Sequence, residues 1–551
     1  MAGTWKPEPE LLASLDDALP GLLDSQKDNG QFGTEPWVCG DQSVLLSLAA
    51  AWSLERSTHH RSEEVLRAIV KGGDALIDAQ DDEGKWTFRK KDGSTWGQTL
   101  MPWTYSRWIR AYALVKEAMA EEERARWDAA LQLGFEQIAR TALGSVHNIP
   151  AHHAMALFCA GEVFGKEDWE AQARAFMQDV VAAQSPHGWW PEHKGPVVAY
   201  NFVYAEALGI YYSLSGDDGV LAALERAARY HASFTYPDGS MVETVDGRNP
   251  YHGGMRLGNV GFTHTSPGRG YLAQQHGFHL AAGNRFAPDH AAQLLLYGAE
   301  GETEPTAAGQ AHHRYEMGDE ALVLRQRPWF ASLSALTVEI PQNRWGQDRQ
   351  NFVSVYHDRT GLIVGGGNTK LQPLWSTFTI GDPSLLRHEP GDESPDFSPR
   401  GGLVHVPTSA SHRSDGDVCT VSLDYGLEQC DVDLEALSDS EMRLTCRSTC
   451  ASGMAVEAHV TLIPHVGEEI GFASCNDQVL GEEPVERSGE AWMTHAGWRL
   501  TLPENARVVW PALPHNPYRK GGEATIEEAR LVVVVPLSKD VGEHTLTLQV
   551  L

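Results

Sequence analysis

The sequence has no apolar run long enough to cross a lipid bilayer, so we expect no helical membrane span. Its first residues lack the basic start and apolar core of a signal peptide. We therefore expect either a cytoplasmic protein or an exported one whose leader is absent from this sequence. Basic residues are also scarce, with 44 Lys and Arg against 74 Asp and Glu and a net charge of -30. That charge argues against nucleic acid or an anionic membrane as a partner.

Cysteine is scarce as well, and seven cysteines spread thinly along the chain fit a reducing compartment. No histidine or cysteine spacing is typical of zinc, since His152 and His153 are too close to supply two ligands from one helix face. The nucleophile motif GxSxG is missing too. We expect no catalytic metal and no cofactor, and a structural divalent cation is not indicated.

What the first half does contain is a repeated turn. Glutamine, then glycine four residues later, then an aromatic residue two further on occur three times, at Gln26, Gln80 and Gln184. A partial copy at Gly239 lacks the glutamine, and a weaker one lies at Gly144. The copies are separated by roughly fifty residues or twice that, which indicates one helical hairpin per repeat.

Helical periodicity between the turns supports this interpretation, and about five such hairpins favour a closed ring over an open solenoid. Helices are predicted over Ser43–Leu54, Glu63–Ala79, Ser106–Ala120 and Ala171–Ala183. The predicted fold is thus multidomain, α then β, with an N-terminal (α/α) toroid of helical hairpins over residues 1–300.

The composition changes over residues 301–320, which we predict to be a linker. From 321 to 551 short strand patterns alternate with Gly, Pro and Asp turns, as in an antiparallel β-sandwich. Predicted strands are Ala321–Arg325, Ser332–Ile340, Phe352–His357, Thr420–Leu423, Met442–Arg447, Met454–Ile463, Leu531–Val535 and His544–Val550. Three consecutive glycines at 365–367 open no helix, so they predict a tight turn and not a phosphate loop.

Polar and aromatic residues gather where each toroid helix is expected to begin. If the ring closes, these helix starts converge on one mouth. The candidates are Asp41, Trp103, Tyr105, Asn148, His152, His153, Tyr200, Asn201, Tyr204, Arg248, Tyr251 and His252. Trp103, Trp189 and Trp190 suit stacking on sugar rings, although Trp189 and Trp190 suit a hydrophobic plug between hairpins equally well.

The order of these features resembles the heparinase II/III-like and alginate-lyase-like polysaccharide lyases. The resemblance rests on the toroid followed by a sandwich, and on Gly188, Glu192, Tyr200 and Ala207-Leu208 in that order. Asn148 lies where the asparagine of those families' Asn-His pair would fall. The next residue is Ile149 and not histidine, which would move the histidine role to His152 or His153.

The resemblance implies a lyase that cleaves an acidic polysaccharide or oligosaccharide by β-elimination at a uronic acid. Tyr200 would be the base or acid, Asn148 would offset the substrate carboxylate, and His152 or His153 would be the second proton-transfer group. The implied substrate-binding residues are Trp103, Tyr105, Trp189, Trp190, Glu192, Asn201, Tyr204, Arg248, Tyr251, His252 and Arg349. Arg349 has an alternative interpretation as part of an ion pair involving the neighbours of Asp348.

Two other functions are compatible with the sequence. A toroid glycoside hydrolase would use a pair of carboxylates from Asp41, Glu192, Glu206 and Asp246. A non-catalytic carbohydrate-binding scaffold would bind sugar without turnover. The identity of the uronic acid, endo or exo action and the oligomeric state do not follow from the sequence.

Overall fold

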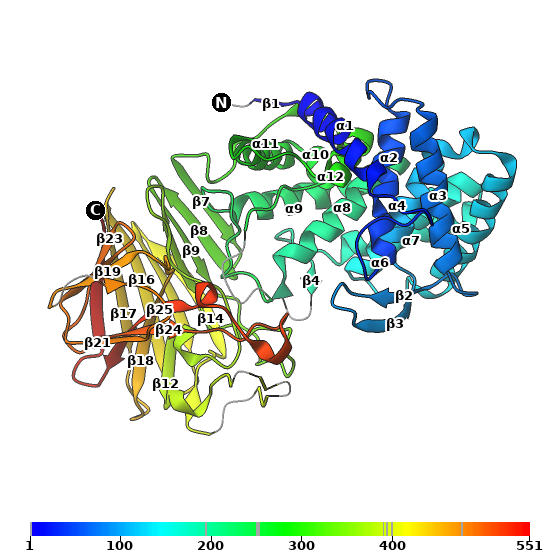
Figure 1. Cartoon of the computed structure of the whole chain (residues 1–551). Helices are drawn as coiled ribbons and strands as arrows, with labels where there is room; N and C mark the ends of the chain where they lie inside the picture. The colour runs from blue at the N-terminus through cyan, green and yellow to red at the C-terminus, as the bar shows by residue number, and fades with distance from the viewer. Residues whose placement is uncertain are drawn as a thin grey trace. The chain divides into compact units, whose positions relative to one another are not determined.

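The computed structural model describes residues 3–192, 195–248, 254–389, 391–392, 395–397, 401–474 and 478–551. The chain forms two compact units that interleave along the sequence (Figure 1). Unit 1 comprises Met1–Trp190, Ala199–Tyr230 and Leu257–Pro305, and unit 2 comprises Pro191–Val198, His231–Arg256 and Thr306–Leu551. The segment predicted as a linker, 301–320, contains the last crossing. The earlier crossings were not predicted.

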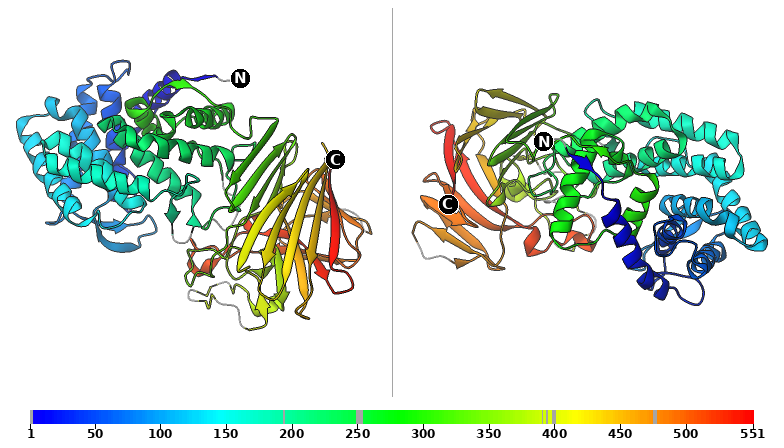
Figure 2. Two further views of the ribbon diagram at one scale, coloured as in Figure 1. Left: turned by 180° about the vertical axis from the view of Figure 1, so that it is seen from behind. Right: turned by 90° about the horizontal axis from the view of Figure 1, so that it is seen from above.

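Unit 1 is built of helical hairpins whose inner helices follow one another around a common centre (Figure 2). The inner helices are α2 (Val44–Ser53), α4 (Pro102–Val115), α6 (Asn148–Phe164), α8 (Val198–Ser215), α10 (Val260–Thr263) and α12 (Pro288–Tyr297). Their outer partners are α3 (Glu63–Ala79), α5 (Glu121–Thr141), α7 (Glu167–Ala182), α9 (Leu221–Ser233), α11 (Ser266–Ala281) and, beside α12, α1 (Glu8–Asp24).

The ring of inner helices closes. Helix α12 packs against α2, α2 against α4, α4 against α6, and α10 against α12. Phe158 on α6 meets Tyr211 on α8 with ring centroids 5.3 Å apart, and Phe202 on α8 stacks on Phe262 of α10 at 5.4 Å. The toroid prediction is confirmed, with six hairpins among the described residues where the repeats suggested about five. No described helix combines the length and apolar character needed to cross a bilayer.

The repeated turn links each hairpin to the next one. In the third copy, Gln184 Nε2 donates to the carbonyl of Ala223 at 2.9 Å, on the outer helix α9 of the hairpin that follows. Gly188 has φ +93°, and a Cβ there would lie 2.1 Å from the Arg226 carbonyl oxygen. Only glycine permits that conformation and that approach. The same contact recurs from Gln26 to Ala68 of α3 and from Gln80 to Ala130 of α5.

Unit 2 contains two antiparallel sheets. The described strands of the larger sheet are β7 (His312–Met317), β8 (Ala321–Gln326), β9 (Trp329–Ser334), β10 (Val353–His357), β11 (Gly361–Val364), β12 (Phe378–Gly381), β13 (Leu403–Val404), β18 (Val456–Leu462), β21 (Val485–Ser488), β24 (Arg507–Ala512) and β25 (Arg530–Leu537). Its main order is β21-β24-β25-β18-β11-β10-β9-β8-β7.

The second sheet has the order β14-β15-β16-β17-β26-β23-β22-β19-β20. Its strands are β14 (Ser409–Asp415), β15 (Val418–Asp424), β16 (Gln429–Ser438), β17 (Glu441–Ser448), β19 (Glu469–Phe472), β20 (Gln478–Val479), β22 (Trp492–His495), β23 (Trp498–Thr501) and β26 (Glu543–Val550). One buried core takes alternating side chains from both sheets, including Val355 and Val533 from the first and Leu444 and Leu548 from the second. The predicted sandwich is confirmed.

Two local predictions need correction. The strand predicted over Ser332–Ile340 ends at Ser334, and the chain then runs irregularly to β10. The three glycines at 365–367 also do more than turn the chain. A Cβ at Gly365 would lie 2.6 Å from Glu243 Oε1, and one at Gly366 would lie 1.9 Å from Arg530 Nε. These glycines therefore let two buried charged side chains approach the backbone.

Candidate functional site

Helices α6 and α8 bring the predicted catalytic residues to neighbouring positions in unit 1. Asn148 is the first residue of α6 and is 6% exposed, whereas Tyr200 on the first turn of α8 is half-buried. His152, one turn further along α6, lies beside the carbonyl of Val203, one turn further along α8. Because His152 lies beside Val203, and Phe158 further along α6 packs on Tyr211 of α8, Asn148 and Tyr200 lie at matching levels on these adjacent helices.

Both candidate histidines are buried in the ring. Burial, with the charges of Arg107 and Arg110, lowers the pKa of His152 to about 3. Burial and the neighbouring His152 lower the pKa of His153 to about 3 as well, and its ring lies near the backbone of Leu100. Both imidazoles are therefore neutral at neutral pH, and only His152 turns toward α8.

A charged cluster that sequence reasoning missed lies inside the same ring. Arg107 on α4 donates from Nε and Nη2 to the two carboxylate oxygens of Asp289 on α12, at 2.9 and 2.7 Å. Its Nη2 is also 3.4 Å from Glu206 on α8. Although burial opposes the change, the Arg107 guanidinium lowers the pKa of Asp289. The pairing of Asp289 and Glu206 with Arg107 could not be assigned from the sequence, because the arginine is about a hundred residues or more from each carboxylate.

Three of the four carboxylates proposed for a hydrolase, all except Glu192, are occupied by structural contacts. Asp41 pairs with Lys91 at 2.6 Å, and Glu206 belongs to the Arg107 cluster. Asp246 accepts hydrogen bonds from the backbone N–H groups of Val198 and Arg248, at 2.8 and 2.7 Å. A hydrolytic acid or nucleophile must instead be directed at substrate.

Trp190 and Tyr204 have a packing role. Trp190 is 1% exposed, and its indole N–H donates to the Val180 carbonyl at 2.8 Å. Tyr204 is also 1% exposed and stacks on Trp190 at 5.0 Å with an interplanar angle of 11°. Trp86 makes the equivalent indole contact with Leu76 in the second repeat. Trp190 is therefore a hydrophobic plug between hairpins. The prediction that Trp190 and Tyr204 contact substrate is wrong, because both rings are buried.

Tyr105 and Asn201 are also buried, because they hold the repeated turns. The Tyr105 hydroxyl donates to the Gly84 carbonyl and accepts from Gln80 Nε2 at 2.7 Å. Asn201 Oδ1 accepts from the Trp190 backbone N–H at 2.8 Å. These residues occupy the predicted helix starts, but their side chains face the turn and not an open surface.

The remaining aromatic candidates are partly accessible. Trp103 is half-buried with its ring centroid 6.0 Å from that of His152, and Trp189 is also half-buried. Sequence reasoning missed Trp96, which is 61% exposed on the hairpin of β2 (Trp86–Arg89) and β3 (Thr95–Thr99). Lys90 lies 4.2 Å from the centroid of its ring. The Asp92-Gly93 turn between two short strand patterns was the available signal.

Unit 2 positions Arg349 between two glycines. A Cβ at Gly195 or Gly247 would lie 3.0 or 2.9 Å from Arg349 Nη2, so neither position admits a larger residue without displacing the guanidinium. Arg349 is 2% exposed and lines a cavity of about 430 Å³ together with Glu192. Burial raises the pKa of Glu192, and the positive charge of Arg248 opposes that shift.

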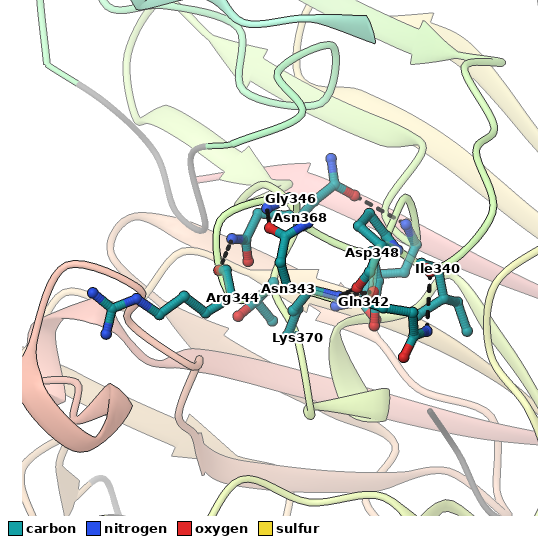
Figure 3. A network of polar contacts seen from close by, with 12 residues as sticks. Ile340, Gln342, Asn343, Arg344, Gly346, Asp348, Asn368 and Lys370 are labelled. Carbon is teal, nitrogen blue, oxygen red and sulfur yellow. Dashed lines mark hydrogen bonds and ion pairs between the residues drawn. The ribbon is translucent and has the colours of Figure 1, made fainter. Parts of the chain in front are cut away.

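Asp348 does not involve Arg349 in an ion pair. Its carboxylate pairs with Lys370 Nζ at 2.9 Å and contacts His405 Nε2 at 3.1 Å, with all three side chains buried. Asp348 thus pairs with Lys370 (Figure 3), and an ion pair of Arg349 with the neighbours of Asp348 stays a prediction. Tyr251 and His252 lie outside the described residues.

Comparison with known proteins supports the fold. No family model matches this sequence, and no curated protein matches it. Among solved structures, the chondroitin AC lyase of Streptomyces coelicolor A3 is 14% identical, with 99% of this chain and 80% of that chain covered and a TM-score of 0.55. Heparinase III is 12% identical, with 98% of this chain and 84% of that chain covered and a TM-score of 0.51.

A Paenibacillus xanthan lyase is 12% identical over 99% of this chain, with a TM-score of 0.55. This chain spans 57% of that protein's length. At such low identity the similarity concerns the fold alone: a helical unit followed by antiparallel sheets, as in these polysaccharide lyases.

Proposed function

We propose that this protein is a polysaccharide lyase that cleaves a uronic-acid-containing glycan by β-elimination. The observation that carries the proposal is that Tyr200, half-buried on the first turn of α8, and Asn148, at the start of α6, begin two adjacent helices at matching levels. The fold of the chain, which resembles that of three polysaccharide lyases, supports the same reaction class.

The reaction removes the proton at C5 of the uronic acid and expels the oxygen at C4. That proton is very weakly acidic until the charge on the adjacent carboxylate is offset, so a neutral donor such as the Asn148 amide stabilises the enolate-like intermediate. Tyr200 transfers the proton, as base toward C5 or as acid toward the leaving oxygen. A tyrosine of ordinary pKa, about 10, needs a nearby donor or positive charge to act as base.

His152 is our choice for the second proton-transfer group, because its ring lies beside the Val203 carbonyl of the helix that carries Tyr200. The His153 ring lies near Leu100 instead. A pKa of about 3 keeps His152 neutral near pH 7, so it has no proton to donate as an acid, and it can act as a base only when bound substrate raises that pKa. Trp103, whose ring lies near that of His152, is retained as a sugar-stacking residue.

The Tyr200→Phe variant tests this proposal. It removes one hydroxyl and keeps the ring, so turnover should fall by a factor on the order of 10²–10⁴ with little change in stability. The product is followed by the ultraviolet absorbance of its C4=C5 double bond, across a panel of uronate-containing polysaccharides.

Tyr204→Phe is the matched control on the same helix. Its ring is 1% exposed and stacked on Trp190, so this variant should retain full elimination activity. Full elimination activity in both variants would exclude Tyr200 from proton transfer. Loss of activity in Tyr204→Phe alone would place the reacting tyrosine one turn further along α8. New reducing ends without ultraviolet absorbance would identify a hydrolase instead.

A further inference from the structure

The β2–β3 hairpin of unit 1 carries an exposed aromatic ring beside two positive charges. Trp96 is 61% exposed and packs on Phe88 with ring centroids 5.3 Å apart. Lys90 Nζ lies 4.2 Å from the Trp96 centroid, and Arg89 on the same strand pair is exposed. Neither Arg89 nor Lys90 forms a salt bridge with a residue that the structure describes. In a chain with a net charge of -30, this hairpin is a local site for an anionic and partly apolar partner.

A groove of the complementary kind lies where helices α1, α2 and α12 meet. Its volume is about 330 Å³, which is small for a ligand pocket and suits one large side chain better than an extended polymer. Exposed Glu55 and Glu300 lie at its rim, and neither forms a salt bridge with another described residue. Arg56 at the same rim is already paired with Glu8 at 2.5 Å. The apolar lining is Leu11, Leu12, Leu54, Leu294 and Leu295.

The hairpin and the groove lie at opposite ends of α2, so one chain cannot bring them together. Lys91 of the hairpin donates to Asp41, which comes just before α2, at 2.6 Å. The groove instead contains Leu54, which directly follows the last residue of α2. The 10 residues of α2 separate these ends by about 15 Å. Figure 1 shows β2 and β3 below the helices of unit 1 and the start of α1 above them.

We propose that the β2–β3 hairpin of one copy of this chain docks in the α1–α2–α12 groove of a second copy. Trp96 enters between the leucines of the groove, and Arg89 and Lys90 pair with Glu55 and Glu300 at its rim. Charge selects this arrangement, because two basic hairpins repel each other whereas a hairpin in a groove brings opposite charges together. Since the two surfaces differ and lie at opposite ends of unit 1, the copies add head to tail. The small surface makes the contact weak and reversible.

The first test follows the mass of the full chain by analytical ultracentrifugation over a wide range of concentrations. We expect species of two and then more chains as the concentration rises. Trp96→Ala should weaken association by about tenfold, as expected for the central aromatic residue of a small interface, and adding Arg89→Ala should abolish it. Leu427→Ala is the matched control, because Leu427 is 53% exposed but lies in unit 2. It should leave association unchanged.

Mixing two variants tests the head-to-tail geometry. The variant with Arg89→Ala and Trp96→Ala keeps the groove, and the variant with Glu55→Lys and Glu300→Lys keeps the hairpin. All four side chains are exposed, so both variants should melt like the wild-type chain. Neither should associate alone, but their mixture should form a one-to-one dimer that grows no further, because only one complementary pair of surfaces remains.

Four results would overturn the inference. The wild-type chain could stay monomeric, in which case a different anionic partner covers the hairpin, or it could stop at a closed dimer. Trp96→Ala could associate as strongly as the wild-type chain, or the mixture of variants could stay monomeric. None of these outcomes depends on the proposed lyase activity, which is measured separately by ultraviolet absorbance.

Discussion

The buried pair of Lys370 and Asp348 allows a quantitative prediction. The two side chains are 0% and 1% exposed, with 2.9 Å between Lys370 Nζ and Asp348 Oδ1. Lys370→Met keeps much of the side-chain volume but leaves the Asp348 carboxylate buried with only His405 beside it, at 3.1 Å. Removing one partner of a buried ion pair costs about 3–5 kcal/mol, because the remaining charge has lost its compensation. We expect a loss of that size in the free energy of unfolding of unit 2.

The assay is urea unfolding, monitored by amide hydrogen exchange in β10 and β25. These strands report on unit 2 and not on unit 1. The double variant Lys370→Met with Asp348→Asn removes both charges and should recover part of the loss. Lys91→Met is the matched control, since Lys91 pairs with Asp41 at 2.6 Å but is 46% exposed. Breaking that surface pair should cost about 0–1 kcal/mol. Equal losses for the buried and the exposed lysine would refute the reasoning.

Two further predictions concern unit 1. Gly188→Ala should lower the free energy of unfolding by about 2–5 kcal/mol, through left-handed backbone strain and the 2.1 Å approach to the Arg226 carbonyl. Gly93→Ala, with φ +84° and no atom within 4 Å of the new Cβ, should cost about 1–2 kcal/mol. Thermal melts compare the two, and equal losses would contradict the packing role of Gly188. The second prediction is pH-dependent: His152 has a pKa of about 3 in the fold, against about 6.5 when unfolded. The unfolded chain therefore binds more protons as pH falls below about 6.5, and stability falls with it. Between pH 6.5 and 5 the contribution of one such histidine is about 2 kcal/mol. His152→Gln should remove it in urea melts at the two pH values, and an unchanged pH dependence would show that His152 is not held neutral.

The toroid could be predicted because the same local requirement recurs at the three full copies of the turn, at Gln26, Gln80 and Gln184. Each full copy needs a left-handed glycine that packs against the next outer helix. It also needs a glutamine that donates to a backbone carbonyl of that helix, so the two residues recur at a fixed spacing in the sequence. The sandwich was predictable for a similar reason, since alternation within each strand reflects one buried and one exposed face.

The roles of individual helix-start residues could not be predicted in the same way. Tyr105, Asn201 and Tyr200 all lie in the first turn of an inner helix, yet two face the repeated turn and only Tyr200 remains partly accessible. Which way each side chain points depends on the rotation of its helix in the ring. The Arg107 cluster was hidden for another reason, because its partners come from helices that meet only when the ring closes.

The interleaving of the two units has a consequence for how the chain is made and how it can be cut. Glu243, far upstream of the sheets, accepts the Gly366 backbone N–H at 2.9 Å, and Arg530 Nη2 donates to the Gly366 carbonyl at 2.9 Å. During synthesis, residues 191–198 and 231–256 leave the ribosome before the strands they belong with exist. A fragment beginning at Thr306 would lack Glu243, so the buried Arg530 would keep only one of its two nearby carboxylates, Glu528. No single cut in the chain therefore yields unit 1 and unit 2 as separate fragments with all of their residues.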